Sequence, residues 1–98
     1  MPLSAKDKRY LKSLGHHIRP SVATGKEGLN EAILSEIDAA LERQELIKIK
    51  IGKGPLNRKD AVAIVGVHIQ AEIVQLLGRN ILLFRKHKHN SEIHFPKK

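Results

Sequence analysis

The chain has 98 residues, a net charge of +8 and a hydrophobic share of 41%, enough for one domain with its own core. It has no cysteine, which excludes disulfides and cysteine-bound zinc, and it lacks the run of roughly 20 apolar residues that a membrane span requires. We therefore expect a single soluble, cytoplasmic domain over residues 1–98 that does not associate with membranes.

The first helix is predicted over about residues 5–14. Ser4 and Asp7 resemble a capping box with Asp in place of Glu, and Leu11 and Leu14 supply a buried stripe. Gly15 should end this helix. Residues 20–23 then read as a short extended segment that leads into a glycine-containing loop.

A second helix is predicted to begin at Asn30, an N-cap residue, where Leu29 and Leu34 occupy the positions of a hydrophobic staple. Apolar side chains fall on one face of this helix and acidic side chains on the other. The apolar face holds Ile33, Leu34, Ile37, Ala40 and Leu41. The acidic face holds Glu31, Asp38, Glu42 and Glu45.

Within residues 46–51, Ile47, Ile49 and Ile51 alternate with two lysines, which predicts a strand with a buried face and an exposed face carrying Lys48 and Lys50. After Asn57, residues 61–69 are rich in β-branched residues, but the helix start before them favours a helix. Two apolar strands then flank a turn at residues 78–80. The predicted fold is an α/β sandwich of order α-β-α-β-α-β-β with a mixed four-stranded sheet, and residues from about 87 to 98 form an edge extension or a loose tail.

Charge is segregated along the sequence. Six of the ten acids lie in residues 27–45, and the rest of the chain holds seventeen bases against four acids, a balance of +13. This distribution indicates a polarised surface with one face for a polyanion. The alternative is that the bases only keep a small protein in solution.

The loop Gly25-Lys26-Glu27-Gly28 joins an extended segment to an N-capped helix, so backbone N–H groups and the positive end of a helix dipole point toward it. Glycine lets a phosphodiester approach the main chain, and Lys26 adds a cation. KH-type GxxG loops clamp a nucleic-acid backbone in this way. The other interpretation is a purely structural turn.

Two stretches of the sequence, residues 8–51 and 73–85, resemble the bacterial YhbY family of stand-alone CRM (chloroplast RNA splicing and ribosome maturation) domains. The resemblance implies a fold like that of the C-terminal domain of translation initiation factor three. It also implies an RNA-binding protein of ribosome assembly, associated with a precursor of the large subunit. The sequence departs from the family pattern at Gly15, Phe84 and Lys86, where Ala, Tyr and Pro are usual.

In this resemblance the family's GxxG loop corresponds to residues 25–28, and its basic first helix and His-x-(Lys/Arg)-Pro segment correspond to further residues here. With the cations of the predicted strand, the candidate RNA-binding residues are Lys8, Arg9, Lys12, His17, Arg19, Gly25, Lys26, Gly28, Lys48 and Lys50. His17 is either a phosphate contact or a packed loop residue, and Tyr10 is expected to pack rather than to stack on a base.

We expect no cofactor and no metal, since the six histidines lack cysteine partners and an HExxH spacing. We also expect no catalytic residues, because no paired acid–base constellation is visible. The expected partner is RNA, ribosomal RNA in a large-subunit precursor, bound by a protein that is monomeric in solution. The alternatives are a structural ribosomal protein and a small RNA-processing enzyme.

Overall fold

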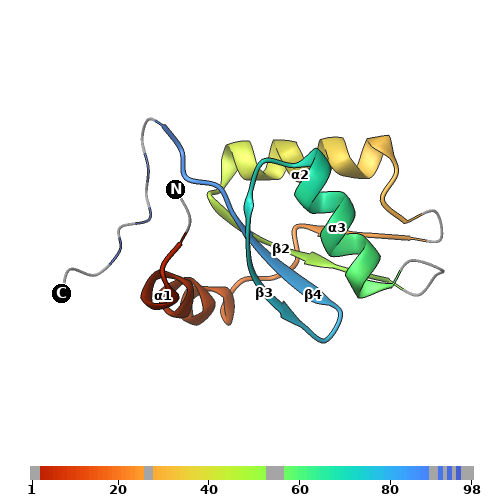
Figure 1. The fold of residues 1–98 in the computed structure, drawn as a ribbon. Coiled ribbons are helices and arrows are strands. Elements are labelled where there is room, and N and C mark those ends of the chain that lie inside the picture. Colours follow the sequence, from red (N-terminus) through yellow and green to blue (C-terminus); the bar gives the residue numbers. More distant parts are fainter. Residues whose placement is uncertain are drawn as a thin grey trace.

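The computed structural model describes residues 3–25, 28–52, 57–88, 91, 93 and 95, and within them three helices accompany one four-stranded sheet (Figure 1). The elements are α1 (Ala5–Gly15), β1 (Val22–Ala23), α2 (Glu31–Arg43), β2 (Leu46–Lys50), α3 (Arg58–His68), β3 (Glu72–Leu77) and β4 (Asn80–Phe84). The predicted element order and the mixed sheet are confirmed.

The strands lie in the order β1-β2-β4-β3, with β1 parallel to β2 and the other neighbours antiparallel. Alternation along β2 separates two cores. Ile47 and Ile49 pack with α2 and α3, whereas Leu46 packs with α1 on the opposite face of the sheet. The sheet is therefore sandwiched between the acidic helix on one side and the basic first helix on the other.

Each helix begins where a capping side chain was predicted. The side chains of Ser4, Asn30 and Asn57 accept a hydrogen bond from the backbone N–H three residues on, at 3.0, 2.9 and 2.8 Å. The cap at Asn57 explains why a segment of high strand propensity is helical, since it satisfies an N–H group that a helix start leaves without a partner. The predicted helix over this segment is confirmed.

Gly15 is the last residue of α1, as predicted, but its role is packing. It does not have a positive φ, and the C-cap His16 is in the right-handed region. Gly15 is buried, and a Cβ there would lie 2.7 Å from Cδ2 of Leu82 on β4. The glycine thus allows α1 to approach the sheet closely.

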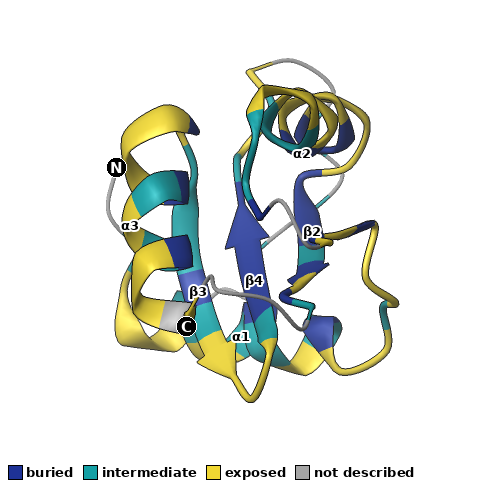
Figure 2. Ribbon diagram, turned by 90° about the vertical axis from the view of Figure 1, so that its right-hand side faces the viewer, coloured by how far each residue is buried: buried dark blue, intermediate teal, exposed yellow. Residues whose placement is uncertain are grey.

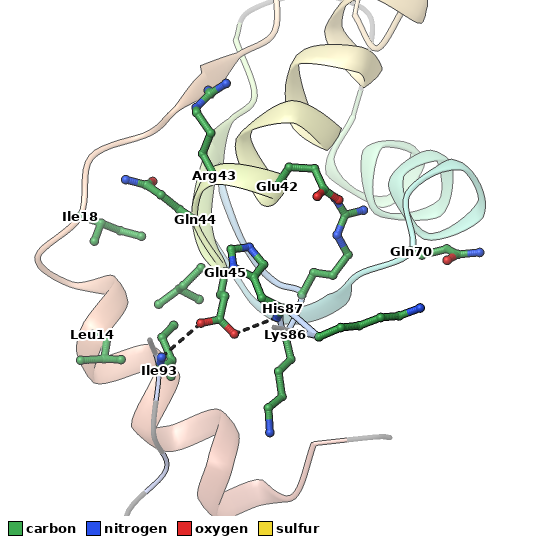
Figure 3. Close-up of a pocket in the computed structure, with 13 residues that line it drawn as sticks. Leu14, Ile18, Glu42, Arg43, Gln44, Glu45, Gln70, Lys86, His87 and Ile93 are labelled. Carbon is green, nitrogen blue, oxygen red and sulfur yellow. Dashed lines mark hydrogen bonds and ion pairs between the residues drawn. The ribbon is translucent and has the colours of Figure 1, made fainter. Parts of the chain in front are cut away.

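The position of Glu45 differs from the one predicted from the sequence. Instead of lying on the exposed acidic face of α2, it follows the helix and is only 4% exposed. Its carboxylate accepts hydrogen bonds from the N–H of His87 at 3.0 Å and the N–H of Ile93 at 3.1 Å (Figure 3). It also accepts one from the hydroxyl of Ser91 at 2.7 Å. A buried carboxylate needs such donors, and here they come from the chain after β4.

The end of the chain also contacts α1. The ring of Phe95 meets those of Tyr10 and Phe84 edge to face, with centroids 6.0 and 5.7 Å apart. Tyr10 is thus a packing residue, as expected, and the buried Phe84 is part of the core on the α1 side of the sheet. No helix in the described ranges is long and apolar enough to cross a membrane.

Candidate nucleic-acid interface

The basic residues of α1 lie on the face of the sheet away from α2 and α3. Leu11 is fully buried against the sheet, which turns Arg9 outward and leaves Lys8 and Lys12 partly buried. His17 and Arg19 are exposed in the segment that connects α1 to β1. Exposed cations on a rigid helix are suited to contact phosphate oxygens.

Lys48 and Lys50 belong to the same face of the sheet as α1, because they alternate with Ile47 and Ile49 of the opposite core. Lys48 is paired in register with Leu82, against which the end of α1 packs. Lys50 lies farther along β2, in register with Ala23 of β1. The two lysines therefore form a basic path from α1 toward the end of the sheet that bears the glycine loop.

Gly25 and Gly28 close a tight turn directly after β1. The N–H of Gly28 donates to the carbonyl oxygen of Gly25 at 3.1 Å, and Gly28 has a φ of +68°, which favours glycine. Gly25 is exposed, and a Cβ there would meet nothing within 4 Å. The open side of the turn is therefore at Gly25, while the N–H of Gly28 is used internally. Lys26, a predicted site residue, lies outside the described residues.

A junction at the same end of the sheet was not predicted. The N–H of Gly52, just after β2, donates to Oγ1 of Thr24 at 3.0 Å, and a Cβ at Gly52 would collide with the carbonyl oxygen of Thr24. Nη1 of Arg79, at the tip of the β3–β4 hairpin, donates to the carbonyl oxygen of Gly52 at 3.2 Å. In the sequence Arg79 is one of the seventeen bases outside residues 27–45, and no local pattern places it beside Gly52.

The acidic residues of α2 lie on the side of the sheet opposite to α1. Glu31, Glu36, Asp38 and Glu42 are exposed on α2, across the sheet from α1. Arg85 pairs with Asp38 at 2.8 Å and with Glu42 at 2.9 Å, so this base neutralises part of the charge on the acidic face. The structure thus brings the α1 cations, Lys48 and Lys50 to one side of the sheet and separates them from most of the acids.

A cleft of about 1140 Å³ lies between the end of α1, the end of α2 and the segment after β4 (Figure 3). Four of the polar side chains that line the cleft form contacts within the fold. Glu42 pairs with Arg85, Glu45 accepts the bonds given above, and a ring nitrogen of His87 lies 2.8 Å from the carbonyl oxygen of Leu41. Among the residues that the structure describes, no group of three or more metal-ligating side chains gathers.

Two known proteins are similar in sequence to this chain over nearly their whole length. The chain is 36% identical over 95 residues to "Probable RNA-binding protein YqeI" of Bacillus subtilis, covering 96% of this chain and 99% of that protein. It is 39% identical over 98 residues to an "RNA-binding protein" of Haemophilus influenzae, covering 98% and 97%.

The fold is likewise similar to a solved structure. The solution structure of the hypothetical protein SAV1595 from Staphylococcus aureus matches with a TM-score of 0.78 and 38% identity, covering 97% of this chain and 100% of that one. Residues 3–85 match the model of the CRS1 / YhbY (CRM) domain. The chain therefore belongs to the CRS1/YhbY (CRM) domain family.

Proposed function

We propose that this protein binds RNA through the phosphate backbone and assists the assembly of the large ribosomal subunit. The interface comprises α1, the segment after it, the Lys48–Lys50 face of β2 and the turn at Gly25 and Gly28. The observation that carries the proposal is the separation of charge across the sheet, with α1 and β2 cations on one face and the α2 acids on the other.

The relatives support an RNA partner. One is named a probable RNA-binding protein and the other an RNA-binding protein, and each matches this chain over almost its whole length. The aromatic residues support recognition of backbone and shape. The rings of Tyr10 and Phe84 both pack against that of Phe95, so these rings are engaged in the fold and do not form a platform on which bases could stack. RNA of similar shape but different sequence should therefore bind with similar affinity.

The test compares two matched pairs of charge reversals. In the first variant Arg9 and Lys12 become Glu. In the control Arg43 and Lys86, which are exposed and line the cleft at the end of α2 but do not belong to the proposed interface, become Glu. We expect the α1 variant to lose binding to a fluorescently labelled stem-loop RNA, while the control keeps most of its affinity and both melt like the parent protein. Equal losses in the two variants would mean that net charge alone drives binding, and the proposed interface would be wrong.

The dependence of RNA affinity on salt concentration gives a second test of backbone recognition. If the interface neutralises about four to six phosphates, log affinity should fall with log salt concentration with a slope of roughly −3 to −5. A shallow slope together with strong preference for one RNA sequence would contradict backbone recognition.

The assembly role is tested in cells. An assembly factor should be sub-stoichiometric to ribosomes and should sediment with large-subunit precursors in a sucrose gradient. One copy per mature large subunit would instead identify a structural ribosomal protein, and absence from all ribosomal fractions would refute the assembly role while leaving RNA binding intact.

A further inference from the structure

Three chain segments meet at the end of the sheet that bears the glycine turn. β1 ends at Ala23, β2 ends at Lys50, and the β3–β4 hairpin turns at Gly78 and Arg79. Register brings them together, because Lys50 is paired with Ala23 on one side and with Asn80 on the other. The segments come from distant parts of the sequence and share one edge of the molecule.

Hydrogen bonds hold the three segments in fixed relation. The N–H of Thr24 donates to the carbonyl oxygen of Lys50 at 3.0 Å, and the N–H of Ile51 donates to that of Arg79 at 2.7 Å. The contact between Thr24 and Gly52 closes the junction, since any side chain at Gly52 would push the two strand ends apart. The position of Arg79 relative to the glycine turn is therefore set by the sheet.

The turn between β3 and β4 is coloured as exposed in Figure 2, and it consists of Gly78 and the exposed Arg79. Gly78, with a φ of +60°, supplies the left-handed conformation that a two-residue hairpin loop requires. One N–H of the guanidinium donates to the carbonyl oxygen of Gly52, and no described acid forms an ion pair with Arg79. A guanidinium has several N–H donors, so most of this group remains available to an external anion.

We propose that Arg79 binds a phosphate of the RNA next to the one held at the Gly25 turn, so that the hairpin tip extends the interface across β2. This inference rests on the proposed function and adds a residue from the other side of the sheet. The bond to Gly52 fixes the planar group, and a fixed guanidinium loses less freedom when it binds phosphate than a mobile lysine does. Lys50 lies between the two phosphate positions and adds a cation to the path.

The experiment compares Arg79→Ala, Arg79→Lys and the control Arg43→Ala, which removes an exposed arginine from the end of α2. Binding of a fluorescently labelled stem-loop RNA is measured at several salt concentrations, and melting is followed on the same preparations. We expect Arg79→Ala to weaken binding about tenfold and to flatten the salt slope by about one phosphate contact. Arg79→Lys keeps the positive charge, so it should keep the salt slope and bind with an affinity between those of the parent protein and Arg79→Ala. Arg43→Ala should bind like the parent protein.

Two results would overturn the inference. If Arg79→Ala binds like Arg43→Ala, the hairpin tip does not touch RNA, although the parent protein still binds and the proposed function stands. If Arg79→Ala weakens binding but leaves the salt slope unchanged, the arginine only positions the junction and is no phosphate ligand. Failure of the parent protein to bind RNA at all would refute the proposed function itself.

Discussion

The two glycines of the loop after β1 should respond differently to alanine, and the difference separates a binding role from a structural one. Gly28 has a φ of +68° and is buried, so Gly28→Ala places a side chain in the left-handed region. Gly25 does not have a positive φ, and its Cβ would meet no atom within 4 Å. Gly25→Ala therefore adds one methyl group to an open surface without strain.

The expected magnitudes follow from this geometry. The left-handed conformation costs an alanine about 1–2 kcal/mol, and in a domain of this size each kcal/mol lowers the melting temperature by roughly 4–8 °C. Gly28→Ala should thus melt several degrees lower than the parent protein. Gly25→Ala should melt at the same temperature or slightly higher, because alanine restricts the unfolded chain.

RNA binding should follow the opposite order. If a phosphate approaches the main chain at Gly25, the added methyl group blocks it, and Gly25→Ala should lose more than tenfold in affinity while remaining fully folded. The assay is fluorescence anisotropy with a stem-loop RNA at a temperature well below both melting transitions. Unchanged affinity in Gly25→Ala would refute the phosphate site at this turn and leave the loop as a structural connection.

Two further predictions concern the buried carboxylate and the cations of the sheet. Glu45→Gln replaces an acceptor of three hydrogen bonds with a group that has only one acceptor oxygen. In a denaturant titration this variant should therefore be less stable than the parent protein by about 1–3 kcal/mol, and the segment after β4 should become accessible to protease. Equal stability of the two proteins would contradict the role assigned to Glu45. Replacing Lys48 and Lys50 together by Gln should leave melting unchanged and flatten the salt slope by about two phosphate contacts, and an unaltered slope would remove β2 from the interface.

The fold could be predicted from the sequence because its signals are local. Each capping side chain bonds an N–H only three residues away, and the alternation along β2 assigns its faces without reference to any other strand. Even the helix with strand-like composition was identified, since Asn57 marks its start. These patterns determine which segments are helices and strands, and the short connections between them limit how the segments pack.

The candidate site could be predicted only in part, for a physical reason. The bond from Arg79 to Gly52 joins residues 27 apart, and the bonds to Glu45 join residues more than 40 apart. Such contacts depend on strand register and on the path of the chain after β4, which no short window of sequence records. From the sequence alone, Glu45 is therefore assigned to the acidic face of the second helix, and Arg79 is one of seventeen bases outside residues 27–45.

The sequence also does not tell which basic residues share one side of the fold. Arg79 and Arg85 are close in the sequence, but β4 runs between them and places them at opposite ends of one strand. Arg79 bonds Gly52, whose N–H donates to Thr24 next to the glycine turn. Arg85 binds Asp38 and Glu42 and contributes to the stability of the acidic side. The excess positive charge of the chain is therefore larger than the charge that an RNA would meet. The salt slope should report only the cations on the α1 side of the sheet and at the hairpin tip, and this number depends on the fold as well as on composition.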